Sequence, residues 1–78
     1  MKVEVMGPGC KNCETLAKRT KKAIEDLELE ADFEHVQDMN EMTERGIALS
    51  PALLVDDEAV VTGEVPSVDK IKEILSSS

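Results

Sequence analysis

Residues 7–14 read GPGCKNCE and place two cysteines, Cys10 and Cys13, three positions apart directly after a Gly-Pro-Gly sequence. Proline fixes its own φ and lacks a backbone N–H, and glycine adopts conformations closed to other residues, so this sequence ends the element before it. The cysteine pair therefore follows a turn. Such a pair is open to three interpretations: a redox couple, half of a metal site, or two thiols that only pack.

The residues around the turn predict a strand before it and a helix after it. Residues 2–6, KVEVM, alternate with Val3 and Val5 on one side, as in a short strand. From Cys13 onward, apolar and small residues recur at steps of three and four, which predicts an amphipathic helix of about four turns. These positions are Cys13, Leu16, Ala17, Thr20, Ile24 and Leu27. Both cysteines are then expected in its first turn, on the same side.

The start of a helix is an environment that favours a thiolate. Unpaired N–H groups and the helix dipole stabilise negative charge there, so we expect Cys10 to be biased toward its thiolate, with Lys11 acting in the same direction. Cys13, on the apolar stripe, is expected to be shielded and less acidic. This asymmetry suits a two-step exchange in which Cys10 attacks a substrate disulfide and Cys13 resolves the mixed disulfide. Packing alone is a fair explanation for Cys13 but a weak one for Cys10, which stands in a polar loop.

The middle of the chain predicts an edge strand and a short helix. Residues 30–36, EADFEHV, alternate again, and they put Ala31, Phe33 and His35 on one face. We expect His35 to be a half-exposed strand residue. Asp38 is a suitable N-cap with Glu41 three positions on, which approximates a capping box, and Gly46 is a natural terminator. A helix over about residues 39–45 fits between them.

The last third of the chain predicts a hairpin and a final helix. Pro51 opens the apolar run ALLVD, and proline is acceptable there only as a first residue or on an edge. The acidic turn Asp56–Glu58 then leads into AVVTG, so the two runs form an antiparallel hairpin. Ser67 caps the last helix, and Asp69 is favourably placed in its first turn. Its apolar stripe is Val68, Ile71, Ile74 and Leu75, and residues 76–78 are expected to be a frayed tail.

The expected order is strand, helix, strand, helix, strand, strand, helix. A strand, a crossover helix and another strand form a right-handed parallel unit, beside which the hairpin adds two strands. The fold class is therefore α/β, a four-stranded mixed sheet with three helices. Seventy-eight residues are enough for one small domain, so we expect a single domain over residues 1–78.

The charge of the chain is acidic and unevenly distributed. Nine basic and 17 acidic side chains give a formal net charge of −8, which disfavours binding to nucleic acid. Residues 1–22 nevertheless hold six basic and two acidic side chains, a net +4. This basic end is either a solvated helix face or a docking surface for an acidic partner.

No apolar run is long enough to cross a bilayer, and MKVEVM is too short and too alternating for a signal peptide. A cytoplasmic location is therefore expected. Two cysteines in such a chain do not make a disulfide scaffold, which needs several bridges and an oxidising compartment.

Metal binding is the serious alternative to redox chemistry. Short copper-binding domains of ferredoxin-like fold also place CxxC between a first strand and a first helix. Those domains resemble MxCxxC, whereas Pro8 stands two positions before Cys10 here, and they end on a strand rather than a helix. Zinc requires four ligands, and the chain offers two thiols and one histidine, His35.

With CKNC after the first strand and Ser50-Pro51 before the third, the chain resembles the thioredoxin superfamily, in particular its small prokaryotic redox-active disulfide proteins of glutaredoxin size. The resemblance spans MKVEVMGPGCKNC, RGIALSPALLVDDEAVVTGEVPS and the closing helix. It implies a single thioredoxin-like domain over residues 1–78. It also implies that Pro51 is cis and packs against the cysteine pair, and that the backbone of Ser50 pairs with bound substrate as an added strand.

The function implied by this resemblance is that of a thiol-disulfide oxidoreductase without a cofactor. Cys10 would be the nucleophile and Cys13 the resolving thiol, and the substrate side would be formed by Lys11, Asn12, Ser50 and Pro51. The implied partners are protein disulfides and an electron donor of the thioredoxin-reductase type. The chain itself is expected to be a monomer. In a reducing cytosol, reduction of substrate disulfides is the expected direction.

The chain also departs from the pattern of its superfamily. Gly9 stands where thioredoxins have tryptophan, and Lys11-Asn12 replaces their Gly-Pro. The tyrosine and the glycine pair with which glutaredoxins hold glutathione are missing, with Gly63-Glu64 near the expected place of the pair, so glutathione is not the expected reductant. The sequence shows no obvious buried carboxylate to assist Cys13.

Overall fold

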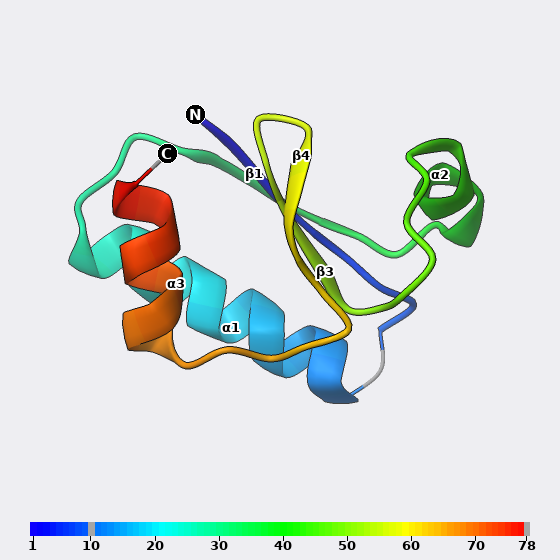
Figure 1. The fold of residues 1–78 in the computed structure, drawn as a ribbon. Helices are drawn as coiled ribbons and strands as arrows, with labels where there is room; N and C mark the ends of the chain where they lie inside the picture. Colours follow the sequence, from blue (N-terminus) through cyan, green and yellow to red (C-terminus); the bar gives the residue numbers. More distant parts are fainter. Residues whose placement is uncertain (10, 78) are drawn as a thin grey trace.

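The structure, a computed structural model, describes residues 1–9 and 11–77. Its elements follow the predicted order along the chain (Figure 1). They are β1 (Lys2–Met6), α1 (Lys11–Asp26), β2 (Asp32–Val36), α2 (Met39–Glu44), β3 (Ala52–Val55), β4 (Glu58–Thr62) and α3 (Val68–Ser76).

The four strands form one mixed sheet in the order β2-β1-β3-β4. β1 pairs with β2 in parallel and with β3 antiparallel, and β3 and β4 form the predicted antiparallel hairpin. β2 lies at an edge, as its sequence predicted, although it begins at Asp32 rather than at residue 30. The α/β fold class and the four-stranded mixed sheet with three helices are therefore confirmed.

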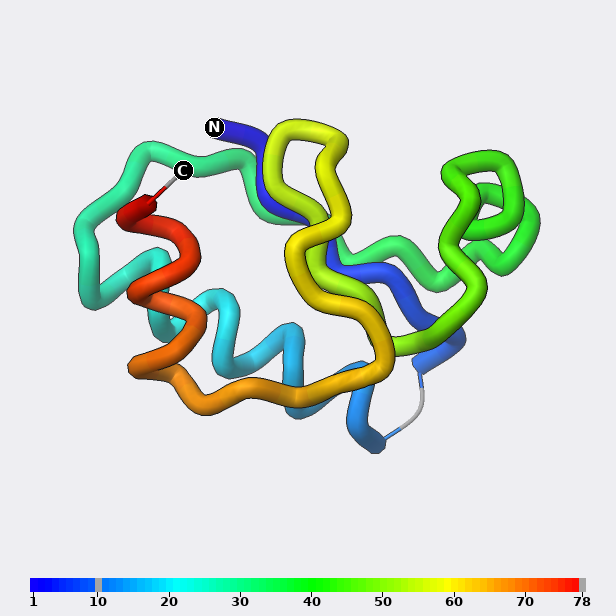
Figure 2. Tube along the Cα trace, viewed as in Figure 1, coloured from blue at the N-terminus to red at the C-terminus, as the bar shows by residue number. Residues whose placement is uncertain are grey.

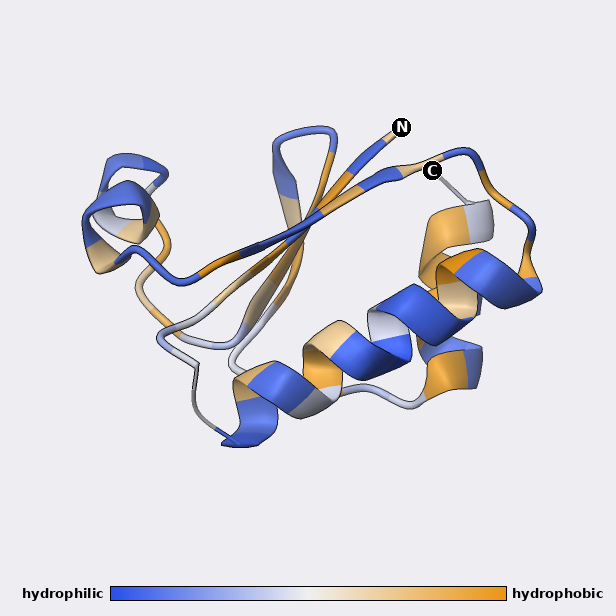
Figure 3. Cartoon of the chain, turned by 180° about the vertical axis from the view of Figure 1, so that it is seen from behind, coloured by the Kyte–Doolittle hydropathy of each residue, from blue (hydrophilic) through white to orange (hydrophobic). Residues whose placement is uncertain are grey.

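Helices α1 and α3 cover one face of the sheet, and α2 lies on the other (Figures 1 and 2). The larger core cluster joins β1 to both long helices through Val3, Val5, Leu16, Ile71 and Leu75, among others. The smaller cluster lies under α2 and consists of Met6, Val36, Met42, Ala52 and Leu54. The outer face of α1 is mainly hydrophilic (Figure 3), as expected for an amphipathic helix with one buried stripe.

Strand β1 is buried on both faces, although its alternation predicted one apolar side. Four of its five residues are buried, and Glu4 is only 1% exposed. The cause is position: β1 is an inner strand of a sheet that carries helices on both faces. Because successive side chains point to opposite faces of a strand, Val3 and Val5 face α1 and Glu4 faces the α2 side.

The predicted boundaries of α2 are confirmed in outline, with one change of detail. The Asp38 carboxylate accepts from the Asn40 N–H at 2.8 Å, and Gly46 ends the segment with φ of 73°. The capping box is not closed by Glu41, whose side chain instead accepts from Arg45 at 3.3 Å. The helix is thus capped by the Asp38 side chain alone, and the Glu41 carboxylate pairs with Arg45 after the last turn.

The hairpin turn and the C-terminus differ slightly from expectation. The turn consists of Asp56 and Asp57, both with positive φ, and Glu58 already belongs to β4. Two successive positive φ values match a two-residue hairpin turn whose twist suits the strands. Ser76 lies within α3 and the Ser77 N–H donates to the Glu73 carbonyl at 3.2 Å, so the prediction of a frayed tail from Ser76 is wrong. Ser78 lies outside the described residues.

No helix in the described part of the chain combines the length and apolar character that a bilayer crossing requires.

Candidate active site

The described cysteine, Cys13, lies in the first turn of α1 and is fully buried. Its exposed fraction is 0%, as the apolar stripe of the helix predicted. Lys11 and Asn12, which precede it, are exposed. Cys10 comes directly before Lys11 in the sequence and lies outside the described residues.

The end of β1 brings the chain against Cys13. Gly7 is buried, and its N–H donates to the Val36 carbonyl at 2.9 Å. A Cβ built on Gly7 would overlap the Cys13 sulfur and would lie 3.0 Å from the Cys13 Cβ. The same position lies 3.8 Å from the Cα of Pro51. Gly7 is therefore the point at which β1, α1 and the start of β3 meet.

Pro51 is buried directly before β3, and the Ser50–Pro51 peptide bond is cis. The Pro51 carbonyl accepts from the Gly63 N–H at 2.8 Å, which extends the β3–β4 ladder by one bond. Ser50 is exposed, and Leu49 before it is 59% exposed. Leu49 packs over Gly63, since a Cβ at Gly63 would meet its Cδ1 at 3.3 Å. Two exposed residues, Leu49 and Ser50, thus come directly before the buried proline at the start of β3.

The structure brings together two of the predicted site residues, Cys13 and Pro51, which both lie close to Gly7. Lys11, Asn12 and Ser50 are exposed in the same chain segments. Figures 1 and 2 show the end of β1, the start of α1 and the start of β3 at the same end of the molecule. Gly7 was predicted only as a turn residue. The sequence did carry a signal, because residues 3, 5 and 7 share one face of the strand. The side chains on that face are Val3, Val5 and then Gly7, which has none.

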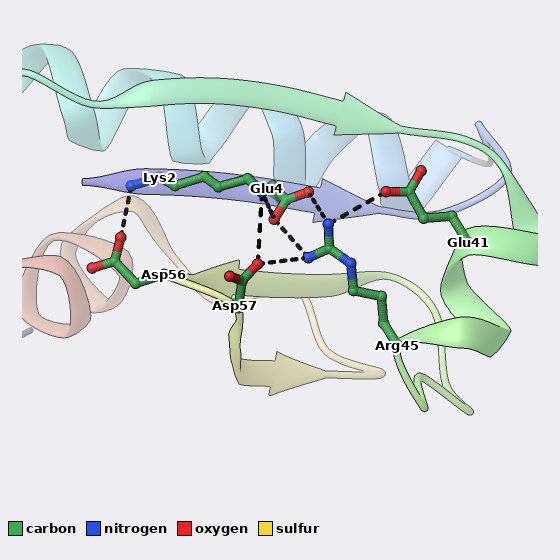
Figure 4. Close-up of polar contacts among 6 residues, drawn as sticks. All are labelled: Lys2, Glu4, Glu41, Arg45, Asp56 and Asp57. Carbon is green, nitrogen blue, oxygen red and sulfur yellow. Dashed lines mark hydrogen bonds and ion pairs between the residues drawn. The ribbon is translucent and has the colours of Figure 1, made fainter.

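Glu4 is a buried carboxylate that the sequence pattern did not predict, and it lies away from Cys13, on the α2 face. Arg45 donates to its two oxygens at 2.9 and 3.2 Å (Figure 4). The hydrogen bond to Glu4 raises the pKa of Arg45 above its ordinary value, with smaller contributions from the charges of Glu4, Asp57 and Glu41. Both oxygens of Glu4 thus accept hydrogen bonds from Arg45 and do not face Cys13.

Within residues 1–9 and 11–77, no group of three or more histidine, cysteine, aspartate or glutamate side chains could hold a metal ion. His35 is half-buried in β2, as predicted, and its Nε2 is buried without a hydrogen-bond partner. It lines a cavity of about 310 Å³ together with Glu14, Ala17, Lys18 and Lys21.

A larger cavity, of about 490 Å³, lies between the hairpin turn and α3 and is lined by Val55 and Ile74, among others. Val55 is the last residue of β3 and Pro51 directly precedes its first, so the two lie about 13 Å apart at the usual rise per residue. This cavity is therefore remote from Cys13 and Pro51.

A family model described as a thioredoxin domain matches residues 1–76. The chain belongs to the thioredoxin superfamily. Two proteins named thioredoxin are similar to it over nearly their whole length. The one from Methanothermobacter thermautotrophicus is 40% identical over 76 residues, which cover 97% of this chain and 99% of the relative. The one from Methanocaldococcus jannaschii is 37% identical over 75 residues, covering 96% and 86%.

These relatives assign the chain to a family of thiol-disulfide oxidoreductases, and they do not favour the metal-binding alternative. Thioredoxin family membership indicates, in general terms, protein disulfides as substrates and reductases as partners.

Proposed function

We propose that this chain is a protein disulfide reductase of thioredoxin type, in which Cys10 is the nucleophile and Cys13 the resolving thiol. The observation that carries the proposal is the position of Cys13: a fully buried sulfur in the first turn of α1, packed against Gly7 and close to Pro51. Its occurrence in a member of the thioredoxin superfamily supports the assignment of a redox role to the pair.

The chemistry is a two-step thiol-disulfide exchange. The Cys10 thiolate attacks one sulfur of a substrate disulfide, forms a mixed disulfide and releases the other substrate sulfur as a thiolate. Cys13 then loses its proton and attacks the Cys10 sulfur, which forms the Cys10–Cys13 disulfide and releases the second substrate thiolate. Two electrons pass from the cysteine pair to the substrate, and the protons of the pair end on the substrate thiols.

The burial of Cys13 supports this division of roles. A sulfur with 0% exposure cannot reach a disulfide of a folded partner, whereas it can attack a neighbour three residues away in the chain. The exposed side chains of Lys11, Asn12 and Ser50, and the strand start at Pro51, form the substrate side in this proposal. An extended substrate segment would pair there with the backbone of Ser50.

The proposal includes an electron donor of the thioredoxin-reductase type, which reduces the Cys10–Cys13 disulfide after each turnover. The chain acts as a single thioredoxin-like domain over residues 1–78 and as a monomer. It works in the cytoplasm, where thiols are kept reduced.

The test uses an oxidised peptide with one disulfide bond. Turnover is measured as the rate above that of dithiothreitol alone, and adduct formation is measured with pre-reduced protein from which dithiothreitol has been removed. Cys10→Ser should abolish peptide reduction, because it removes the attacking thiolate. Cys13→Ser should accumulate a covalent protein–peptide adduct, visible as one added peptide mass, because the mixed disulfide can no longer be resolved. Equal residual activity in the two variants would contradict the assigned roles.

A matched control places an exposed cysteine elsewhere on the surface. Ala59 is exposed on β4 and lies in no helix, so Cys10→Ser/Ala59→Cys carries an accessible thiol outside the proposed site. This protein should form adduct at the rate of free cysteine. Adduct formation as fast as that of Cys13→Ser would show that the site contributes nothing to reactivity.

A further inference from the structure

Gly7 and the Cys13 sulfur occupy adjoining space that leaves no room for a side chain between them. A Cβ on Gly7 would overlap the Cys13 Sγ and would lie 3.0 Å from its Cβ, closer than ordinary contact. Gly7 and Cys13 are both buried, so neither residue can shift toward solvent without disturbing the side chains packed around it.

The Gly7 backbone is held in place by its neighbours. Its N–H donates to the Val36 carbonyl at 2.9 Å, one step beyond the β1–β2 register that ends with Met6 opposite Val36. On the β3 side, Met6 is opposite Ala52, and the Cα of Pro51 lies 3.8 Å from the position of a Gly7 Cβ. A side chain at residue 7 would therefore displace the cysteine sulfur in preference to the backbone.

The absence of a side chain is the property of Gly7 that matters here. Gly9, Gly46 and Gly63 have positive φ values, which explain glycine at those positions. Gly7 is not among them, so its backbone conformation is open to other residues. Alanine at residue 7 would introduce one methyl group against the Cys13 sulfur without backbone strain.

We propose that Gly7 is a positioning residue for the resolving step, one that acts by allowing the Cys13 sulfur to lie where it can attack the mixed disulfide at Cys10. This inference rests on the proposed function. The step forms the Cys13–Cys10 S–S bond, breaks the bond between Cys10 and the substrate sulfur, and leaves that sulfur as a thiolate that takes up a proton. Gly7 contributes nothing to the first attack, which involves Cys10 and the substrate only.

The test measures formation and resolution of the mixed disulfide separately, each with glycine and with alanine at residue 7. In the Cys13→Ser background, formation of the mixed disulfide with the peptide measures the first step alone. With Cys13 present and peptide in excess, release of the second peptide thiol measures resolution. Gly7→Ala should slow resolution at least tenfold, because a displacement of about 1 Å at a reacting atom can cost about 10²-fold in rate. The first step should stay within about twofold, a split that general loosening of the fold would not produce.

Gly46→Ala is the matched control. Gly46 has φ of 73° and no atom within 4 Å of a built Cβ, so alanine there adds backbone strain without a steric contact. It should leave both rates unchanged. Normal resolution in folded Gly7→Ala would overturn the inference and leave the proposed function intact, and equal slowing of both steps would also overturn it. Failure of wild type and Cys13→Ser to react at all would instead overturn the proposed function.

A thermodynamic measurement keeps the inference testable if Gly7→Ala does not fold. Cys13→Ala removes the sulfur that the added methyl group would overlap and leaves the contact with the residue 13 Cβ at 3.0 Å, which a shift of a few tenths of an ångström relieves, so Gly7→Ala/Cys13→Ala should fold. Rescue of folding by Cys13→Ala would support the competition for space between residues 7 and 13. Loss of folding in both proteins would overturn it.

Discussion

The guanidinium of Arg45 lies 2.9 Å from a carboxylate oxygen of Glu4, a residue of the inner strand β1 that is 1% exposed. The nitrogen that makes this contact, Nη1, also lies 2.9 Å from a carboxylate oxygen of Asp57 in the hairpin turn. The other terminal nitrogen, Nη2, lies 3.3 Å from a carboxylate oxygen of Glu41 on α2 (Figure 4). Arg45 therefore joins three parts of the fold: the sheet, the hairpin turn and the C-terminal end of α2. The chain continues from Arg45 to Pro51, so this link also anchors the segment that leads into the candidate active site.

We predict that Arg45→Met lowers the melting temperature, because it leaves the Glu4 carboxylate buried without its two charge-assisted hydrogen bonds. Lys2 remains 3.6 Å from Glu4, beyond the distance of a strong hydrogen bond. Glu4→Gln should then raise the melting temperature of Arg45→Met but lower that of wild type, a reversal of sign that calorimetry can detect. Glu4→Gln effects of the same sign in both backgrounds would contradict this account.

Lys22→Met is the control for this prediction. Lys22 and Asp26 also form an ion pair, at 3.0 Å, but the lysine side chain is 59% exposed. Exposed pairs at this helical spacing contribute little to stability, so the melting temperature should hardly change. A shift as large as that of Arg45→Met would show that burial is not what makes the Arg45 pair important.

We predict that the stabilisation by Arg45 is independent of pH through the neutral and mildly alkaline range. The hydrogen bond to Glu4 raises the pKa of Arg45 above its ordinary value, which already lies well above this range. A group whose pKa is higher in the folded state stabilises fully below its unfolded pKa and loses this effect only as pH rises through the folded value. The difference in melting temperature between wild type and Glu4→Gln/Arg45→Met should therefore stay constant from about pH 7 to about pH 9. A difference that shrinks across this range would contradict the prediction.

Local sequence signals predicted most of the fold. Asp38 and Ser67 cap their helices as expected, since a cap requires only the side chain and the N–H groups that follow it. The alternation of Val3 and Val5 correctly predicted a strand. It could not predict the burial of Glu4, because alternation identifies the faces of a strand and does not show whether a second layer covers the other face.

The sequence predicted only those features of the candidate site that depend on residues close together in the chain. The helical stripe predicted the burial of Cys13, and the position of Pro51 before an apolar run predicted the start of β3. The contact between Gly7 and Cys13 depends on how far β1 extends past α1 and on its register with β2 and β3. That register arises from pairing between distant segments, so residues 7–14 alone could not predict it.

The contact between α1 and α3 gives a prediction for the hydrophobic core. Leu75 is 1% exposed in the larger core cluster, so Leu75→Ala should lower the free energy of unfolding by about 2–5 kcal/mol. That loss is a large fraction of the stability of a domain of this size. Leu49→Ala is the control: at 59% exposure it should cost less than about 0.5 kcal/mol in urea denaturation. Similar losses for both variants would mean that α3 is not packed as described.

The burial of Cys13 predicts its chemical reactivity. In Cys10→Ser the only remaining thiol has 0% exposure in the native fold, so an alkylating reagent can reach it only after local opening of the first turn of α1. Iodoacetamide should therefore label native Cys10→Ser at least about 10²-fold more slowly than the same protein in denaturant at equal pH. In Cys13→Ser the remaining thiol is the proposed nucleophile, and it should be labelled rapidly without denaturant. Fast labelling of native Cys10→Ser would show that Cys13 is accessible, and its assignment as the shielded, resolving member of the pair would then be wrong.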